Sequence, residues 1–247
     1  MAAVIPLIQT RALTRQFGGL KAVDNVDFNL ESGKIHAIIG PNGAGKTTFV
    51  SLLSGRLLPD SGTILFDGQD ITTMPAHKRV QVGIAYTFQI TSVFANLSVY
   101  DNVALPVQRR LLQRGRVDPG ALHQSVFEVL DRVGMADHAH SKAGSLSYGH
   151  QRLLEVAMGL ALQPRLLILD EPTQGLSDGE IDTFIELVRE IARDATVLLI
   201  EHNMQVVMAL ADRITVMNNG KILAEGTPSE IRANAAVQEA YLGGGDV

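Results

Sequence analysis

A phosphate-binding loop is the clearest chemical signal in the sequence. Residues 40–48 read GPNGAGKTT, which fits the pattern G-x-x-x-x-G-K-T. In this pattern backbone N–H groups surround phosphates, Lys46 carries an ammonium to the outer phosphates, and Thr47 offers a hydroxyl to Mg²⁺. A glycine turn beside a surface lysine is the alternative, but the apolar run KIHAIIG before the loop and the helical pattern TTFVSLLSGRLL after it favour nucleotide binding. The residues expected to contact the nucleotide are Gly40, Pro41, Asn42, Gly43, Ala44, Gly45, Lys46, Thr47 and Thr48.

Two adjacent acids end another apolar run, LLILDE. Alone, such a pair is usually a solvated turn. With a phosphate loop upstream, Asp170 is expected to hold the magnesium, and Glu171 to orient and deprotonate the attacking water.

The segment LSYGHQ, residues 146–151, stands before the helical run RLLEVAMGLAL. The N-terminus of a helix has unsatisfied N–H groups and the positive end of the helix dipole, so Ser147 and Gly149 provide a binding site for an anion there. No catalytic partner is near in sequence, and the anion must come from elsewhere.

Several apolar patterns indicate the elements that hold these residues. Val26, Phe28 and Leu30 alternate with polar residues as in a half-buried strand, and ESGK then indicates a tight turn, so we expect an antiparallel N-terminal part. KIHAIIG, RLLILDE and ATVLLIEH are buried-type strands with polar residues at their carboxyl ends. They predict a mostly parallel sheet with a ligand at that edge.

A helical region lies between the first two of these strands, over residues 91–162. Ser98 with Asp101 resembles a capping box, and GALHQSVFEVLDRVG has helical spacing and a glycine stop. Near the end of the sequence, Asn218, Asn219 and Gly220 between RITVM and KILAEG predict a hairpin.

Composition narrows the class of protein. The 247 residues are 46% hydrophobic and carry a net charge of −5, which argues against a nucleic-acid partner. There is no cysteine, no apolar run of membrane-spanning length and no export signal, so we expect a protein of the cytosol. The basic cluster at residues 109–116 is interpreted as a solvated helix end, and His138 with His140 as a solvated loop, not a metal site.

The order of the motifs resembles that of the ATP-binding cassette (ABC) ATPases: GPNGAGKTT, Gln89, LSYGHQ, LLILDEP, GLSD and His202 follow one another over nearly the whole chain. The resemblance implies an α/β fold with a P-loop NTPase core, in which helices flank a mostly parallel sheet, an N-terminal antiparallel β subdomain and an inserted helical subdomain. It divides a single ATPase domain, residues 1–247, into a nucleotide-binding core, residues 1–90 and 163–247, and a helical subdomain, residues 91–162, that carries the signature.

Further roles follow from the resemblance alone. Ser147 and Gly149 of the signature, residues 146–151, would bind the γ-phosphate of ATP held on a second subunit, in a head-to-tail homodimer or heterodimer. Gln89 matches the glutamine that reaches magnesium and water and links the site to a membrane subunit. His202 matches the histidine that contacts the γ-phosphate. Lys46, Gln89, Glu171 and His202 would therefore form the catalytic set, with ATP and Mg²⁺ as cofactors.

Some positions depart from the family pattern. Asp178 matches the aspartate at the dimer seam, although GLSD lacks the alanine that usually precedes the leucine. Phe17 falls where an aromatic residue, more often tyrosine, stacks on adenine; a buried strand phenylalanine is the alternative. Tyr148 and His150 replace residues of the usual LSGGQ signature, while Ser147 and Gly149 are kept. Phosphate recognition should survive these changes, with the contacts near ribose and at the subunit seam altered.

Phrases such as DGQDIT, GIAYTFQ and VQEAYLG resemble the ATPase subunits of branched-chain amino acid importers, in particular the larger of the two ATPases. Such importers imply integral membrane permease subunits, a periplasmic binding protein acting indirectly, and a peripheral position at the cytoplasmic face of the inner membrane. The alternatives are an importer of urea, amides or aromatic acids, an exporter, a soluble cassette ATPase acting on DNA or ribosomes, and a regulatory module that binds nucleotide without hydrolysis. The cargo does not touch this chain, so its residues do not identify the cargo.

Overall fold

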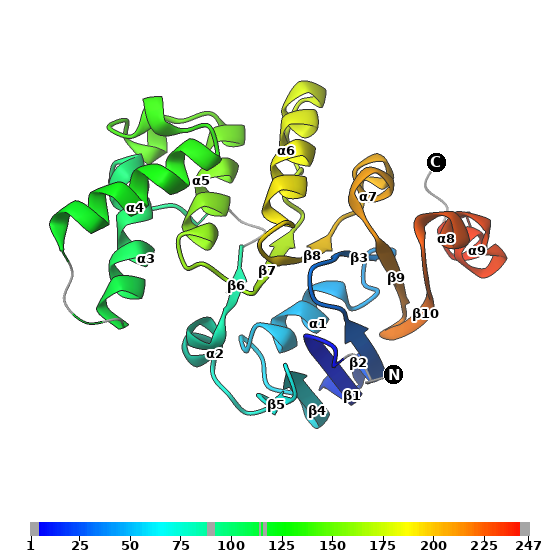
Figure 1. The fold of residues 1–247 in the computed structure, drawn as a ribbon. Coiled ribbons are helices and arrows are strands. Elements are labelled where there is room, and N and C mark those ends of the chain that lie inside the picture. The colour runs from blue at the N-terminus through cyan, green and yellow to red at the C-terminus, as the bar shows by residue number, and fades with distance from the viewer. Residues whose placement is uncertain (1–4, 88–91, 114, 116–117, 243–247) are drawn as a thin grey trace.

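Two β-sheets and a helix between them form the centre of the molecule. The computed structural model describes residues 5–87, 92–113, 115 and 118–242 (Figure 1). In the larger sheet the strand order is β10-β9-β3-β8-β7-β6, and all neighbours are parallel except β10 and β9. Its strands are β3 (Ile35–Ile39), β6 (Ile84–Tyr86), β7 (Leu166–Asp170), β8 (Thr196–Ile200), β9 (Arg213–Asn218) and β10 (Lys221–Gly226). The smaller sheet is antiparallel, in the order β2-β1-β4-β5, with β1 (Ile8–Phe17), β2 (Leu20–Leu30), β4 (Ser61–Phe66) and β5 (Gln69–Asp70).

The central strands are buried on both faces, which is why they are continuous apolar runs in the sequence. In β7, Leu166 and Ile168 belong to the core around α1 (Lys46–Leu53), which lies between the two sheets. Leu167 and Leu169, which alternate with them, belong to the core on the opposite face. The strand therefore joins two hydrophobic cores.

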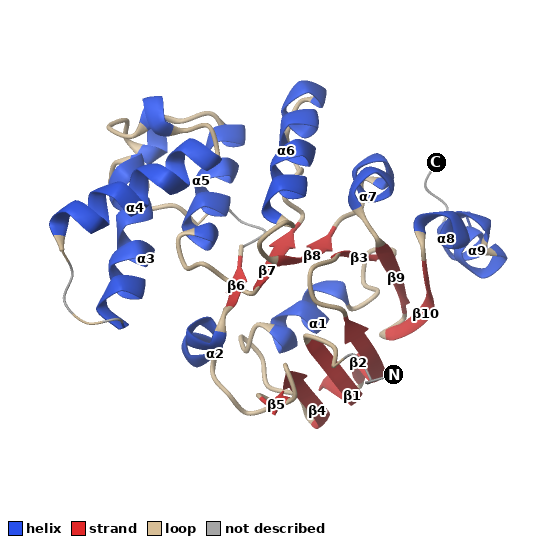
Figure 2. Cartoon of the chain, in the orientation of Figure 1, coloured by secondary structure: helices blue, strands red, loops and turns tan. Residues whose placement is uncertain are grey.

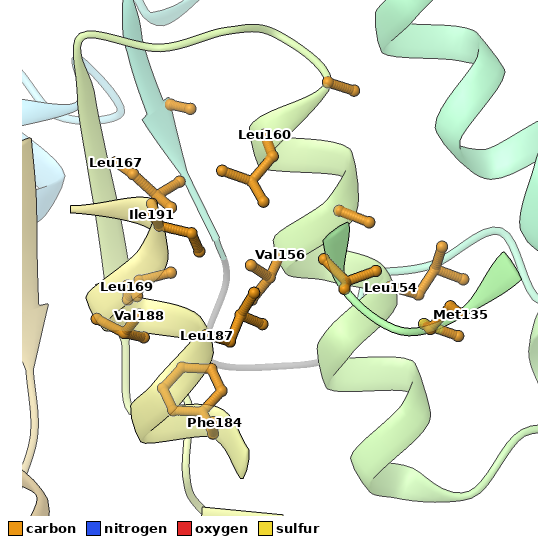
Figure 3. Close-up of a cluster of buried hydrophobic side chains, with 14 of the residues drawn as sticks. Met135, Leu154, Val156, Leu160, Leu167, Leu169, Phe184, Leu187, Val188 and Ile191 are labelled. Atoms are coloured by element: carbon orange, nitrogen blue, oxygen red, sulfur yellow. The ribbon is translucent and has the colours of Figure 1, made fainter. Parts of the chain in front are cut away.

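The opposite face of the sheet is covered by α6 (Asp178–Ile191) and α5 (Tyr148–Leu160). Figure 3 shows Val156 of α5 beside Leu187 of α6, and Leu160 of α5 on the side of Leu167 and Ile191, all within one hydrophobic cluster. A third core packs α7 (Met204–Leu210), α8 (Pro228–Ala233) and α9 (Ala235–Leu242) against β3 and β9.

A helical insert lies between β6 and β7 in the chain and to one side of the sheets in space (Figure 2). It contains α3 (Val99–Gln113), α4 (Pro119–Arg132), the short turns η1 (Ala136–His138) and η2 (Ala143–Ser145), and α5; α2 (Ala76–Val82) precedes β6. Before α3, the Ser98 Oγ accepts a hydrogen bond from the Asp101 N–H at 2.9 Å, so the expected cap is present.

The expected fold class is confirmed, with differences in detail. The antiparallel part is built by a hairpin at Gly18 and Gly19 between β1 and β2, whereas the ESGK turn carries the chain from β2 to β3 in the other sheet. Helix α1 ends at Leu53, earlier than its pattern predicted, because Gly55 has φ 77°. The β9–β10 hairpin is confirmed: Asn219 and Gly220 have φ 47° and 76°.

Candidate functional site

Three loops meet at one edge of the larger sheet. The P-loop, residues 40–48, follows β3; Asp170 and Glu171 lie at the end of β7; and His202 follows β8. Strand β8 lies between β3 and β7, and the three are parallel, so their carboxyl ends face the same edge. The sheet thus brings together residues that are more than a hundred positions apart in the sequence.

The P-loop is shaped by close backbone packing. Gly45 has φ 100°, and a Cβ atom there would lie 2.1 Å from the Ala22 carbonyl oxygen of β2. The Gly220 N–H of the β9–β10 hairpin donates to the Ala44 carbonyl at 3.0 Å. Both sheets therefore hold the loop, and only glycine fits at position 45.

Lys46 is held in place before any nucleotide arrives. Its Nζ donates to the Gly40 carbonyl at 2.6 Å and to the Pro41 carbonyl at 3.1 Å, inside the curve of the loop. Burial lowers the pKa of Lys46, while the nearby charges of Glu171 and Asp170 raise it. The ammonium stands at the N-terminus of α1, whose first turn has no acidic residue, so the site suits a polyanion.

Asp170 has a carboxylate oxygen that lacks a protein partner. The residue is 1% exposed, and the Tyr86 hydroxyl donates to Oδ2 at 2.6 Å. The other oxygen, Oδ1, is buried with no hydrogen-bond partner among the described residues. Burial raises the pKa of Asp170, against the hydrogen bond from Tyr86, and burial likewise raises the pKa of Tyr86. An unpaired buried carboxylate oxygen fits a hard cation such as Mg²⁺, and Thr47, exposed in the first turn of α1, adds a hydroxyl.

Glu171 has a backbone conformation that is unusual for a residue with a side chain. Its φ is 48°, in the left-handed region, and its N–H donates to the Ile200 carbonyl of β8 at 2.9 Å. Such strain costs about 1–3 kcal/mol and is found at sites where a side chain must be aimed. The conformation turns the chain sharply at the end of β7, beside Asp170.

The loop of His202 is supported by a buried acid to which the sequence analysis gave no role. The Glu201 side chain is fully buried, and its Oε2 accepts from the N–H groups of His202 and Asn203 at 3.0 and 3.2 Å. Its Oε1 accepts from the Thr173 N–H at 3.0 Å and also from the Thr173 hydroxyl. Glu201 therefore joins the loops after β7 and β8, while the His202 side chain stays 61% exposed beside them. The acid directly before His202 was the only signal in the sequence.

Phe17 and Asp178 lie on the surface. Phe17, at the end of β1, is 46% exposed, so the alternative of a buried strand phenylalanine is wrong. The Arg15 guanidinium lies 5.0 Å from its ring centroid. Asp178 is exposed in the first turn of α6, where Ser177 and Glu180 form a capping box.

The signature opens a helix, as its pattern predicted. Ser147 is the N-cap of α5, and its Oγ accepts from the His150 N–H at 3.2 Å and bonds to His150 Nδ1 at 2.7 Å. A Cβ atom on Gly149 would lie 2.3 Å from Glu180 Oε1, so α5 begins in close contact with α6. Figure 1 places α5 in the helical insert, apart from α1, which follows the P-loop.

Gln89, predicted to reach magnesium and water, lies outside the described residues. The residues that flank the undescribed stretch 88–91 are both anchored: the Thr87 N–H donates to the Ile168 carbonyl at 2.9 Å, and the Ser92 N–H donates to Glu155 Oε1 at 2.5 Å. A groove of about 430 Å³ lies beside them, lined in part by Tyr86, Phe94 and Leu105.

No helix in the described part of the chain is both apolar enough and long enough to span a bilayer.

Comparison with known families gives two matches along the chain. The ABC transporter family matches residues 23–174. The family described as branched-chain amino acid ATP-binding cassette transporter matches residues 221–247.

Curated relatives match over nearly their full length. The chain is 40% identical to the high-affinity branched-chain amino acid transport ATP-binding protein LivG of Escherichia coli (strain K12), over 96% of this chain and 98% of that protein. It is 39% identical to the corresponding protein BraF of Pseudomonas aeruginosa, with the same coverage. A probable LivG of Archaeoglobus fulgidus is 35% identical, over 97% of this chain and 96% of that protein.

Solved structures share the fold. A nucleotide-free ATP-binding cassette from an ABC transporter superposes with a TM-score of 0.84 at 28% identity, over 96% of this chain and 98% of the other. The ADP conformation of an ATP-binding cassette of an ABC transporter gives 0.83 at 29% identity, over 96% and 99%.

Proposed function

The chain belongs to the ABC transporter family, in its branched-chain amino acid branch, and we propose that it is the ATP-hydrolysing subunit that drives an importer of branched-chain amino acids. The observation that carries the proposal is the meeting of the P-loop, the Asp170–Glu171 pair and the His202 loop at one sheet edge. A regulatory module that only binds nucleotide has no need of the acid and histidine beside the phosphates.

Binding of ATP begins with groups that are already in position. The N–H groups at the start of α1 and the Lys46 ammonium face the phosphates, and Lys46 exchanges its bonds to the Gly40 and Pro41 carbonyls for bonds to phosphate oxygens. Phe17, exposed at the end of β1, offers a ring on which adenine stacks.

Thr47, Asp170 and Gln89 are the proposed magnesium ligands. The buried, unpaired Asp170 Oδ1 supports this assignment, since Tyr86 already occupies the other oxygen. When bound, Mg²⁺ neutralises charge on the outer phosphates and so lowers the barrier to phosphoryl transfer.

Hydrolysis is assigned to Glu171 and His202. Glu171 orients the attacking water and accepts its proton, while Lys46 and the loop N–H groups stabilise charge on the transferred phosphoryl group. His202 contacts the γ-phosphate from the neighbouring strand end. The Glu201–Thr173 contact, which joins the loops after β7 and β8, supports concerted positioning of these two side chains.

The complete site is proposed to form between two subunits. In a head-to-tail dimer, Ser147 and Gly149 of one chain bind the γ-phosphate held on the P-loop of the other, with Asp178 at the seam. The opening of α5 at these residues supports this arrangement, because a helix N-terminus attracts phosphate. The partner chain is a second cassette ATPase, identical or related.

A membrane permease is the proposed second partner. The groove lined by Thr87 and Ser92 also has exposed Phe94 and Leu105 on its lining, which suits a short amphipathic helix of a permease. Docking there would hold this chain at the cytoplasmic face of the membrane, with a periplasmic binding protein acting through the permease.

In the same proposal, residues 91–162 form the helical subdomain, and residues 1–90 and 163–247 form the nucleotide-binding core.

The test is uptake by cells that carry Lys46→Ala in the chromosomal copy. We expect loss of leucine, isoleucine and valine uptake, with uptake of urea and an aromatic acid unchanged. Lys34→Ala, which removes an exposed lysine, is the matched control. Loss of another substrate instead would reassign the cargo, and intact uptake of every substrate in a strain without a redundant system would refute the importer.

A further inference from the structure

A polar stripe runs along one face of the signature helix, buried at Arg152 and Glu155 and exposed at Tyr148. Tyr148, Arg152 and Glu155 are spaced at i, i+4 and i+7, so they lie on one side of α5. The Arg152 and Glu155 side chains are only 3% and 4% exposed, and their ion pair measures 2.9 Å from Nη1 to Oε2. We call these three residues the α5 stripe.

The ends of the α5 stripe reach different parts of the site. At one end, Glu155 Oε1 accepts from the Ser92 N–H at 2.5 Å and from the Ser92 hydroxyl at 3.2 Å. At the other end, Arg152 Nη2 donates to the Tyr148 hydroxyl at 2.9 Å, and the guanidinium lies 5.3 Å from the Tyr148 ring centroid. The ring packs on the loop after Glu171, because a Cβ on Gly175 would lie 2.9 Å from Tyr148 Cε1.

The α5 stripe is not what anchors the helix. Helix α5 is already fixed by Leu154, Val156 and Leu160, which belong to the large apolar core with α6 and β7 (Figure 3). A buried ion pair adds little net stability compared with apolar side chains of the same size, but it fixes geometry when each charge is hydrogen-bonded. Glu155 also lines the groove of about 430 Å³ together with Ser92. The stripe therefore connects that groove to the signature and to the loop after Glu171.

We propose that the α5 stripe is a positioning device that couples the groove to the signature, with the Tyr148 hydroxyl as its contact at the signature end. The inference rests on the proposed function, and it assigns a role to the tyrosine that replaces a glycine of the usual LSGGQ pattern. Displacement of Ser92 moves Glu155, and Arg152 passes this change to Tyr148, one residue from Ser147. The coupling is reciprocal, so closure of the signature on ATP changes the environment of Ser92.

The test uses the full-length chain with Tyr148→Phe, which removes one hydroxyl and keeps the ring against Gly175. The measurement is amide hydrogen exchange of the peptide that contains Ser92. Without nucleotide, we expect the variant to raise the exchange rate at Ser92 by about 3- to 30-fold, the range for a residue within a coupled network. Tyr100→Phe on α3 is the matched control and should leave the rate unchanged, since that ring packs near His123 and Phe127 instead.

A second variant and a second condition complete the test. Arg152→Lys keeps the charge but loses the planar fork that reaches both Tyr148 and Glu155, so it should act like Tyr148→Phe. The second condition is ATP, added to chains that all carry Glu171→Gln. ATP should change the exchange rate at Ser92 in the parent chain and in Tyr100→Phe. In Tyr148→Phe the change should be less than a third of that. Exchange at Ser92 that is the same in Tyr148→Phe and the parent, without nucleotide, overturns the inference. The parent chain could fail to dimerise with ATP while Tyr148→Phe still exchanges faster than the parent at Ser92 without nucleotide. That result would refute the head-to-tail proposal and support the role of the α5 stripe.

Discussion

Replacing Glu171 by glutamine tests the catalytic assignment most directly, because the structure isolates the effect of its charge. Glutamine has the same shape, and the left-handed backbone, φ 48°, costs both residues about the same. The N–H bond to the Ile200 carbonyl at 2.9 Å belongs to the backbone and is kept. The substitution therefore removes the proton acceptor and its negative charge, and it keeps the backbone conformation.

The expected result is a loss of turnover without a loss of binding. A positioned general base contributes about 10²- to 10⁴-fold, so the barrier should rise by at least about 2.7 kcal/mol. Burial raises the pKa of Asp170 and the charge of Glu171 raises it further, so the variant should keep Asp170 more readily ionised. The Lys46 pKa, lowered by burial, falls further without Glu171, which works slightly against binding. These changes oppose each other, and we expect the Kd for ATP to stay within about threefold.

The assay is phosphate release by the purified chain, with ATP affinity measured by titration on the same preparation. Glu186→Gln removes an exposed carboxylate of α6 and serves as the control. Turnover of Glu171→Gln at the level of this control would refute the assignment. A loss of ATP binding equal to the loss of turnover would indicate a structural or metal-binding role instead.

Three further predictions concern binding and stability. Phe17→Ala should weaken ATP binding by about 5- to 50-fold with little change in thermal stability. Nucleotide titration and calorimetry measure these two quantities, and an unchanged affinity would show that Phe17 does not stack on adenine. Gly45→Ala should lower the free energy of unfolding more than Gly43→Ala does, since both have positive φ but only the first new Cβ meets backbone, 2.1 Å from the Ala22 oxygen; equal losses in urea denaturation would contradict this. Burial lowers the pKa of His36 to about 4, whereas the pKa of this histidine in the unfolded chain is near 6.5. Between these two pH values the unfolded chain binds a proton at His36 that the folded protein does not. Stability should therefore fall by about 3 kcal/mol as the pH drops from 7 to 4, and the fall should be that much smaller in His36→Gln.

Much of the candidate site could be predicted because its chemistry is local. The P-loop needs consecutive N–H groups, glycines and one lysine, so all of its phosphate-binding groups lie in one contiguous stretch of sequence. The same holds for the hairpin at Asn219 and Gly220, whose positive φ values suit those residue types. The strand ends at Asp170 and His202 were visible as polar residues after buried runs, and a parallel sheet brings such ends to one edge.

Other features depended on contacts that no pattern in the chain announces. The ESGK turn was identified, but its role in passing between two sheets depends on which strands pair. Whether Phe17 is buried or exposed depends on what packs at the end of β1. Glu201 looked like one more polar residue at a strand end, and only the neighbouring position of Thr173 makes it a link between loops.

The sequence by itself determined the phosphate loop, the acids after β7 and the order of motifs that defines the family, since each is written in neighbouring residues. Only the tertiary structure decided that Tyr86 occupies one oxygen of Asp170, and that Arg152 and Glu155 join Ser92 to Tyr148. The physical reason is that these bonds join segments far apart in the chain. Their distances are set by the strand order of the sheet and by the packing of α5 on its apolar core.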